Sequence, residues 1–281
     1  MELLLLIPGG LLLLCLLYVC LTKPGRRREK AAELVAFRYA HRGLHRGREV
    51  PENSLQAFRA ACEAGYGIEL DVQLSRDGVP MVFHDGTLMR LCGREDRVGA
   101  LTAAELSACR LYGRADTGVP TLAEVLALVD GRVPLLVELK SGTSDITTLA
   151  EQTVRLLDDY RGFYGIESFN PYVVAWFRRH RPEVVRGQLT SRFSAWKGFK
   201  VSLRHCLIQW YLTNCITRPD FLSHDYRFRD ALPFRCQRKL YRPYTMAWTV
   251  SSPQEAEACA DFDTIIFEGF TPPTRTTGHE N

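Results

Sequence analysis

Beyond residue 36 the chain alternates short apolar runs with longer amphipathic stretches. The apolar runs predict eight β-strands, over Phe37–Ala40, Gly67–Val72, Pro134–Lys140, Phe163–Ser168, Val184–Leu189, Asp220–Ser223, Tyr244–Val250 and Thr264–Phe267. Apolar residues at helical spacing lie between most of them and predict helices over Leu55–Ala64, Leu122–Val129, Ile146–Tyr160 and Tyr172–His180. Eight strands with helical crossovers predict an α/β fold, a (β/α)8 TIM barrel. A doubly wound sheet is the alternative, although no glycine-rich nucleotide loop follows the first strand.

A separate apolar segment precedes the barrel. Leu3–Leu21 is uncharged and rich in leucine, and as a helix it has about the length that crosses a bilayer. This predicts a transmembrane anchor over residues 1–22, interrupted by Pro8-Gly9-Gly10. A cleaved secretory signal is disfavoured because no basic residue precedes the run and no small-residue cleavage pattern follows it. Residues 23–35 follow as a basic juxtamembrane linker, so the positive-inside rule predicts a single-pass membrane protein whose C-terminal bulk is cytoplasmic.

Composition narrows the possibilities only slightly. The 281 residues are 46% hydrophobic and 24% charged, as in ordinary globular proteins, and a net charge of +4 does not predict a nucleic-acid partner. The nine cysteines include no CxxC pair, which indicates reduced thiols rather than disulfides or a zinc site. One barrel-sized domain over residues 36–270 is therefore expected. The Thr- and Pro-rich residues 271–281 are predicted to be a disordered tail.

Acidic residues gather on the inward face of two predicted strands. In Gly67–Leu74, Glu69 and Asp71 share one face, while the apolar residues share the other and would pack outward against helices. Glu138 lies near the C-terminal end of a later strand, on the same face as Lys140. Unpaired inward carboxylates are costly, so a compensating cation is expected. An all-oxygen set suits Mg²⁺ or Ca²⁺, and the alternative for Glu138 is a salt bridge with Lys140.

Turn signals predict two further contacts. Asp77-Gly78 between extended runs is typical of a two-residue hairpin, in which His84 lies directly opposite Asp71 and shares its face. A slip of one residue would turn His84 away. Asn53, three residues before Gln56, is predicted to cap the first helix of the barrel.

Two segments depart from simple alternation of strand and helix. Residues 86–118 are too irregular for a crossover and predict a small insertion over the barrel mouth. Residues 193–211 place aromatic residues at helical spacing beside basic ones. That pattern predicts an ordinary barrel helix or, alternatively, a helix in a membrane interface, which would add lysophospholipids to the substrates.

As a set, the motifs resemble a known enzyme family. HRG, PENS, GIELDVQLSRDG, MVFHD, VPTLAEVL and LLVELK, followed by ESFNP, RGQL and AWTV, are similar to glycerophosphodiester phosphodiesterases, whose known members have a barrel of the phosphatidylinositol-phosphodiesterase type. The resemblance covers about residues 40–269. Ser54 and Gly86 are mild departures from the family pattern. The last strand ends in Phe267-Glu268 where the family commonly has Thr-Asp, which puts the far wall of the pocket and the leaving-group preference in doubt.

The resemblance implies metal-dependent hydrolysis of glycerophosphodiesters to glycerol 3-phosphate and an alcohol. It assigns the roles of general acid and base to His41 and His84, without saying which is which, and leaves water and the substrate's own 2-hydroxyl as possible nucleophiles. It further implies a divalent cation, Mg²⁺ or Ca²⁺, on Glu69, Asp71 and Glu138. Arg42 and Lys140 would bind the phosphate, with Glu52 as a hydrogen-bonding or metal-associated carboxylate. Separately, Trp248 either walls the pocket or fills the barrel interior.

Two other functional classes stay open. A lysophospholipase D or a phosphodiester lyase on lipid substrates would use the same groups and differ in its product. A non-catalytic, membrane-tethered binding module is disfavoured because the sequence retains every expected chemical group.

Overall fold

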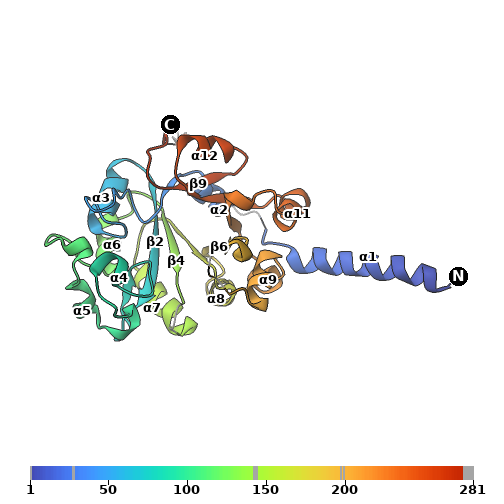
Figure 1. Cartoon of the computed structure of the whole chain (residues 1–281), viewed down its shortest axis with the longest axis horizontal. Coiled ribbons are helices and arrows are strands. Elements are labelled where there is room, and N and C mark those ends of the chain that lie inside the picture. Colours follow the sequence, from blue (N-terminus) through green and yellow to red (C-terminus); the bar gives the residue numbers. More distant parts are fainter. Residues whose placement is uncertain (1, 27–28, 142–144, 197, 199, 275–281) are drawn as a thin grey trace.

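Eight parallel strands close into a barrel in the computed structural model, which describes residues 2–26, 29–141, 145–196, 198 and 200–274 (Figure 1). The strands are β1 (Tyr39–Ala40), β2 (Gly67–Leu74), β4 (Leu135–Leu139), β5 (Tyr164–Ser168), β6 (Val185–Thr190), β7 (Phe221–Asp225), β8 (Tyr244–Val250) and β9 (Thr264–Phe267). Each pairs with the next, and β1 pairs with both β2 and β9, which closes the sheet. The predicted barrel is thereby confirmed.

Helices surround the barrel, and they include the four that the apolar spacing predicts. They are α3 (Leu55–Glu63), α6 (Leu122–Val129), α7 (Ile146–Asp158), α8 (Pro171–His180), α9 (Leu203–Gln209), α10 (Asn214–Thr217), α11 (Leu232–Tyr241) and α12 (Pro253–Ala258). Ile68, Leu70 and Val72 of β2 are fully buried in the core between strands and helices. Their outward direction leaves the alternate residues of β2 to face the barrel interior.

The hairpin after β2 has a different register from the predicted one. β3 (Pro80–Val82) pairs antiparallel with β2, and Val72 lies opposite Val82. The turn therefore holds three residues rather than two, and Ser75 N–H donates to the Val79 carbonyl across it. Phe83, not His84, lies across from Asp71, since the Phe83 N–H donates to the Asp71 carbonyl at 3.0 Å. The predicted pairing of Asp71 with His84 is wrong by one residue.

A short helix closes the N-terminal end of the barrel strands. Helix α2 (Glu29–Val35) buries Ala31, Leu34 and Val35 against interior residues from six strands. These interior residues are Tyr39, Leu136, Val185, Phe221, Met246 and Ile266. Part of the segment predicted as a linker is thus core, and the opposite, C-terminal end of the strands stays open for chemistry.

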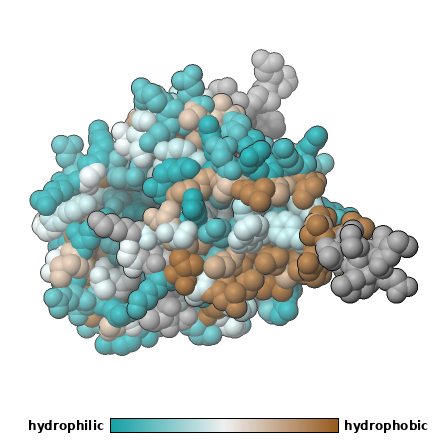
Figure 2. Space-filling view, turned by 45° about the vertical axis from the view of Figure 1, so that its right-hand side comes forward, coloured by the Kyte–Doolittle hydropathy of each residue, from teal (hydrophilic) through white to brown (hydrophobic). Residues whose placement is uncertain are grey.

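The N-terminal apolar segment forms the helix α1 (Glu2–Thr22), which projects from the barrel (Figure 1). No helix in the described part of the chain is long and apolar enough to cross a membrane, so the predicted transmembrane helix is not supported. The end of α1 is joined to the barrel, because Asn214 Nδ2 donates to the Thr22 carbonyl and Arg218 Nη1 to the Lys23 carbonyl. Figure 2 shows apolar surface around this junction.

The segment over residues 86–118 folds around a small core of its own. It contains α4 (Met89–Cys92), α5 (Ala103–Ser107) and two 3-10 turns, Val98–Ala100 and Leu111–Gly113. Leu88, Leu91, Val98, Leu106 and Leu111 pack with Met81 and Phe83 of the hairpin. The insertion is therefore attached rigidly to the strand end that carries His84.

Two further predicted segments lie over residues 193–211 and 271–281. Residues 193–211 form a 3-10 turn at Phe193–Ala195 and then α9, not one continuous amphipathic helix, and positions 197 and 199 lie outside the described residues. Residues 275–281 of the predicted tail also lie outside the described residues. The carbonyls of Pro272 and Pro273 accept hydrogen bonds from Tyr66 Oη and Arg38 Nη1.

Candidate active site

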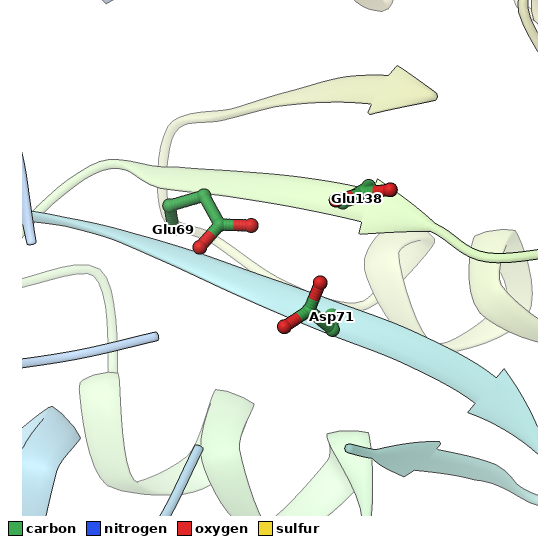
Figure 3. A group of neighbouring side chains, drawn as sticks. All are labelled: Glu69, Asp71 and Glu138. Atoms are coloured by element: carbon green, nitrogen blue, oxygen red, sulfur yellow. The ribbon is translucent and has the colours of Figure 1, made fainter. Parts of the chain in front are cut away.

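Three carboxylates meet at the C-terminal end of the barrel strands. Glu69 and Asp71 come from β2 and Glu138 from β4, where Asp71 and Glu138 are register partners. All three are buried, and their ligand atoms lie within 4.8 Å of one another (Figure 3). Burial raises the pKa of Glu69 well above its ordinary value, and the neighbouring carboxylates Asp71 and Glu138 raise it further. Burial also raises the pKa of Glu138 despite Lys140 beside it.

Two cations hold Asp71 in its charged form. Lys140 Nζ lies 3.1 Å from Asp71 Oδ1 and 2.8 Å from Glu138 Oε2, while Arg42 Nε lies 3.5 Å from Asp71 Oδ2. Burial would raise the pKa of Asp71, but Lys140, His84 and Arg42 hold it well below its ordinary value. The Glu138–Lys140 salt bridge expected as an alternative therefore exists, within a larger cluster that Lys140 shares with Asp71.

Arg42 sits in a loop whose backbone is sharply turned. Its φ is +56°, an uncommon value outside glycine, and it is followed by Gly43 at +81°. In this conformation the Arg42 N–H donates to Glu69 Oε2 at 2.9 Å, and Arg42 Nη1 donates to Glu52 Oε1 at 2.6 Å. A Cβ on Gly43 would meet Ala57 and Phe58 at 2.9 Å, so the loop lies against α3 at a position that accepts only glycine.

The second histidine, His84, follows the end of β3 and is held by its neighbours. Its Nδ1 lies 2.7 Å from Asp85 Oδ1, and Gln73 Nε2 of β2 donates to the carbonyls of Phe83, His84 and Asp85. Because His84 lies beyond the paired residues of β3, strand alternation no longer fixes its direction. It therefore lines the central cavity although the predicted register was wrong.

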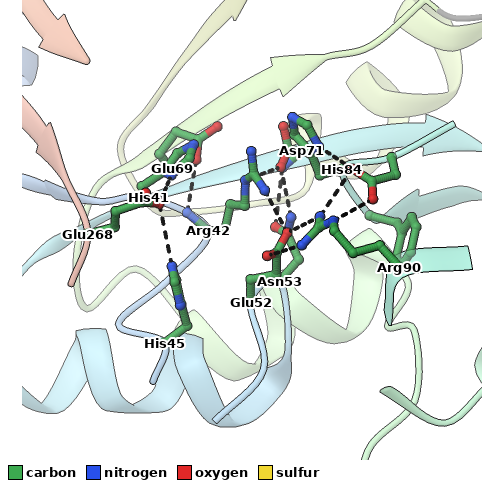
Figure 4. Close-up of polar contacts among 12 residues, drawn as sticks. His41, Arg42, His45, Glu52, Asn53, Glu69, Asp71, His84, Arg90 and Glu268 are labelled. Atoms are coloured by element: carbon green, nitrogen blue, oxygen red, sulfur yellow. Dashed lines mark hydrogen bonds and ion pairs between the residues drawn. The ribbon is translucent and has the colours of Figure 1, made fainter. Parts of the chain in front are cut away.

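Arg90 of the insertion bridges Glu52, in the loop after β1, and Asp85, beside His84. It donates to both oxygens of Glu52 at 2.7 and 2.8 Å and to both oxygens of Asp85 at 2.7 and 3.1 Å (Figure 4). Burial alone would raise the pKa of Glu52, but Arg90 and Arg42 hold it below its ordinary value. Arg90 was not identified from the sequence, because nothing local distinguishes it from the other arginines of the insertion.

The prediction that Asn53 caps a helix is also wrong. Ser54 is the N-cap of α3, and its hydroxyl accepts from the Ala57 N–H. Asn53 has a φ of +52° and turns its amide inward, where Nδ2 donates to Asp71 Oδ2 at 2.7 Å. The adjacent Asn-Ser pair left the cap ambiguous, and only the tertiary contact with Asp71 separates the two residues.

These groups surround a cavity of about 320 Å³ at the barrel mouth. His41, Arg42, Glu69, His84, Glu138 and Lys140 line its polar side, and Phe169, Leu189, Trp196, Trp248 and Ile266 line its apolar side. The Trp248 ring lies 5.5 Å from that of Phe169, and its buried Nε1 has no hydrogen-bond acceptor among the described residues. Trp248 thus faces the cavity, the first of its two predicted positions.

Glu167 is a further acidic residue of the cavity that the sequence analysis did not single out. It lies on β5, in register with Glu138, and is buried. Burial raises its pKa well above the ordinary value, and Glu138 raises it further. The signal was present in the alternation of Tyr164–Ser168, which places Glu167 inward.

The carboxylate set fits a hard divalent cation. Oxygen ligands in a buried cluster are what Mg²⁺ and Ca²⁺ prefer. Burial is the main cause of the raised pKa values of Glu69 and Glu138, and the charge of Asp71 raises both further, against the opposing charge of Arg42 on Glu69 and of Lys140 on Glu138. A cation on Glu69, Asp71 and Glu138 would supply the missing positive charge.

The chain is a closed (β/α)8 barrel, and acidic, basic and imidazole groups gather at the C-terminal ends of its strands. This arrangement is typical of barrel enzymes, whose active sites lie at that end. Residues 41–264 match the Glycerophosphoryl diester phosphodiesterase family, and the chain belongs to this family. The glycerophosphodiester phosphodiesterase of Caldanaerobacter subterraneus subsp. tengcongensis is 36% identical over 159 residues, which are 53% of this chain and 65% of the relative. Glycerophosphodiester phosphodiesterase 1 of Rattus norvegicus is 28% identical over 222 residues, 66% of each chain. The chain thus spans just under two thirds of the length of these relatives.

Solved structures show the same fold. A phosphodiesterase of Oleispira antarctica, in complex with the product sn-glycerol-3-phosphate, superposes with a TM-score of 0.67 at 22% identity over 84% of this chain and 94% of that one. A glycerophosphodiester phosphodiesterase of Thermotoga maritima gives a TM-score of 0.63 at 23% identity over 82% and 93%.

Proposed function

We propose that the protein hydrolyses glycerophosphodiesters to glycerol 3-phosphate and an alcohol with the help of a divalent cation. The observation that carries the proposal is one cavity lined by two histidines, Arg42, Lys140 and the carboxylates Glu69 and Glu138, which cluster with Asp71. Family membership and the product bound to the Oleispira antarctica structure support it.

The charges of the site suit a phosphodiester, whose transition state gains negative charge. Glu69, Asp71 and Glu138 would hold the cation, which would stabilise negative charge on the phosphate. Arg42 and Lys140 bring fixed positive charge to the same cavity, and Trp248 Nε1 is a buried donor without an acceptor in the described part of the chain. Glu52 contributes indirectly, because it orients Arg42 through a 2.6 Å hydrogen bond.

His41 and His84 transfer the protons of the reaction. Each imidazole is bonded at Nδ1 to a carboxylate, His41 to Glu268 and His84 to Asp85, so Nε2 is the nitrogen left for the substrate. One Nε2 takes the proton of the nucleophile, and the other gives a proton to the leaving alkoxide. A histidine suits both tasks because it titrates near neutral pH.

Release of glycerol 3-phosphate from glycerophosphocholine by the purified protein, with Mg²⁺ or Ca²⁺, tests the proposal. We expect His41→Ala and His84→Ala each to lower kcat by about 100-fold or more, the usual contribution of a general acid or base. His180→Ala, at the exposed end of α8, is the matched control and should leave kcat unchanged.

Four results would count against this function or its assigned residues. No release of glycerol 3-phosphate across a panel of headgroups would favour the binding module. Full activity in EDTA would show that the reaction needs no divalent cation. A cyclic glycerophosphate as the final product would indicate a lyase. Near-wild-type turnover of either histidine variant with its cation bound would overturn the two-histidine assignment.

A second candidate substrate is a lysophospholipid, and a specific cavity favours it. Beside the central cavity lies another of about 320 Å³, lined by Phe193, Ile208 and Arg204 and sharing Phe169 and Trp196 with the first. An acyl chain could lie against these aromatic residues while the phosphate occupies the polar side. The exposed leucines 11–14 of α1, and Trp210 beside Tyr18, support delivery from a lipid surface.

Comparing kcat/KM for lysophosphatidylcholine and glycerophosphocholine tests this candidate. We expect Trp196→Ala to lower kcat/KM for the lysophospholipid several-fold more than for the water-soluble diester, because Trp196 lines both cavities and the acyl chain would contact more of its apolar area. Cosedimentation of the full chain with phosphatidylglycerol vesicles tests delivery. Equal losses for both substrates, or no turnover of the lysophospholipid, would contradict the candidate.

A further inference from the structure

We propose that Glu268 is the positioning residue of His41, and that His45 holds the Glu268 carboxylate from another side. The kinetic meaning of this assignment rests on the proposed function, in which His41 transfers a proton. Its structural basis is separate, because it concerns three side chains that lie outside the carboxylate cluster of Glu69, Asp71 and Glu138.

The backbones of His41 and Glu268 are fixed beside each other by the closure of the barrel. His41 follows β1 and Glu268 follows β9, and these strands are parallel neighbours. The His41 N–H donates to the Phe267 carbonyl at 2.8 Å, and the Glu268 N–H donates to the Val250 carbonyl of β8 at 3.0 Å. The pair is therefore set by ladder hydrogen bonds and not by a mobile loop.

The contact between the side chains selects one tautomer of His41. His41 Nδ1 and Glu268 Oε2 are 2.6 Å apart. The hydrogen bond to His41 lowers the pKa of Glu268 well below its ordinary value, and the contact with His45 lowers it further. An ionised carboxylate only accepts, so Nδ1 carries the hydrogen and Nε2 is left without one in the neutral ring.

His45 makes the arrangement a pair of imidazoles on one carboxylate. Its Nε2 lies 3.7 Å from the same Glu268 Oε2, and its backbone N–H donates to the Gly43 carbonyl at 2.9 Å (Figure 4). The side-chain partners of Glu268 in the described ranges are these two histidines. Asp85, by contrast, shares its charge between His84 and the guanidinium of Arg90. Glu268 is thus better placed than Asp85 to stabilise a protonated imidazole.

The pair also lies apart from the substrate side of His41. His41 lines the central cavity of about 320 Å³, whereas Glu268 and His45 line a different cavity of about 590 Å³ with Gly43, Phe267 and Phe270. A change of Glu268 therefore acts on His41 from the side opposite the central cavity. It leaves the carboxylates expected to bind the cation unchanged. Burial lowers the pKa of His41 below its ordinary value and Arg42 lowers it further, while Glu268 and Asp71 only partly offset these effects.

Glu268→Gln tests the proposal, because it keeps the shape of the side chain and removes its charge. We expect kcat to fall about 100-fold, as general acid–base catalysis is lost, with KM and cation affinity nearly unchanged. The limb of the pH profile that reports His41 should move to lower pH, since the imidazolium loses its counter-charge. Nitrogen NMR of the imidazoles should show the hydrogen of His41 on Nδ1 in the wild type and a mixture of tautomers in the variant.

Two further variants separate positioning from a structural role. Glu268→Asp keeps the charge and should recover part of the activity, while His45→Gln should cost less than Glu268→Gln because His41 keeps its partner. Glu257→Gln, the same change on the exposed face of α12, is the control and should behave as wild type. Wild-type kcat and pH profile in Glu268→Gln, or His41 with its hydrogen on Nε2 in the wild type, would overturn the proposal.

A failure of the proposed function would be recognised separately. If the wild-type protein releases no glycerol 3-phosphate, the function fails while the NMR measurement still decides the tautomer. If the wild type is active and Glu268→Gln is equally active, the assignment of Glu268 fails alone.

Discussion

Histidine residues in this barrel occupy environments that differ in what surrounds each ring nitrogen. His41 and His84 have Nδ1 fixed by a carboxylate and line the central cavity. His224 of β7 faces outward and is buried, with the hydroxyls of Thr190 and Tyr211 at 2.8 and 3.1 Å from Nδ1 and the Phe228 carbonyl at 3.2 Å from Nε2. Neutral His224 fits this environment by accepting a hydrogen bond at Nδ1 and donating one from Nε2 to the Phe228 carbonyl.

Protonation of His224 should destabilise the fold in acid. Burial lowers the pKa of His224 to about 4, against 6.5 for an ordinary histidine. Between pH 6.5 and 4 the unfolded chain binds the proton and the folded one does not, so stability falls as the pH falls, by about 3 kcal/mol in all. Urea unfolding of wild type and His224→Gln at pH 7, 5.5 and 4.5 measures this difference in slope.

The comparison depends on slopes and not on absolute stability, because His224→Gln also loses packing against Phe234 at 4.0 Å. We expect a shallower acid limb in the variant. The control is His180→Gln at the exposed end of α8, which should retain the wild-type slope. Parallel limbs in wild type and His224→Gln would contradict the assignment.

Among the elements, the insertion acts on the site through one helix of four residues. Helix α4 carries Arg90, whose guanidinium bonds to Glu52 in the loop after β1 and to Asp85 beside His84. The capping box of α5, in which Thr102 and Glu105 bond reciprocally, and the small apolar core hold the insertion together. Its fold thus bears on the orientation of both Arg42 and His84.

Removing the guanidinium of Arg90 should lower activity without weakening cation binding. Arg90→Met leaves Glu52 and Asp85 without a shared donor, so Arg42 and His84 lose their fixed orientation. We expect kcat to fall about 10- to 100-fold, the usual effect of a residue that orients others at a site. Steady-state kinetics and calorimetric titration with Mg²⁺ measure the two quantities.

Arg114→Met is the matched control on the same insertion. Arg114 forms an equally close ion pair with Asp116, at 2.8 Å, but Asp116 is exposed, whereas the Glu52 and Asp85 partners of Arg90 are largely covered. It should retain full activity, since exposed pairs of this kind contribute little. An equal loss in both variants would mean that Arg90 acts through the stability of the insertion and not through the site.

For the whole molecule, closing the barrel concentrates negative charge that a cation should relieve. The carboxylates of Glu69, Asp71 and Glu138 come from two strands and cannot separate without opening the sheet. Glu167 adds a fourth buried acid from β5. Burial raises the pKa of Glu69 and that of Glu167 well above their ordinary values, and the neighbouring carboxylates raise both further, so the fold without a cation holds protons on these groups more readily than the unfolded chain does.

A divalent cation should stabilise the folded protein, and more so at higher pH. At a concentration 100-fold above its Kd it adds about 2.7 kcal/mol, roughly 5–10 °C in Tm. Because the pKa of Glu69 and that of Glu138 are raised, the cation-free fold binds more protons than the unfolded chain and loses stability as pH rises above their ordinary range. The cation displaces those protons, so its effect shrinks as pH falls.

Calorimetry with Mg²⁺, Ca²⁺ and EDTA at pH 5 and pH 8 measures this difference. Glu138→Gln should reduce the gain in Tm at both pH values by removing one ligand. A gain in Tm that grows as the pH falls would contradict the carboxylate site.

The sequence alone determined the barrel and the inward carboxylates, because both follow from short-range periodicity. Alternation in Gly67–Leu74 and Pro134–Lys140 fixes which side chains face the interior, whichever strands become neighbours. The one-residue error at the hairpin shows the limit, since a turn of two residues and one of three share the same Asp77-Gly78 signal.

Only the tertiary structure decided which charged groups meet. His41 and Glu268 are 227 residues apart, Arg90 and Glu52 are 38 apart, and both contacts exist because the strands close and the insertion packs against the hairpin. Such pairings depend on the order and register of non-neighbouring segments, which local periodicity does not encode. The sequence thus supplied the chemical groups and their inward direction, and barrel closure gave His41 its partner.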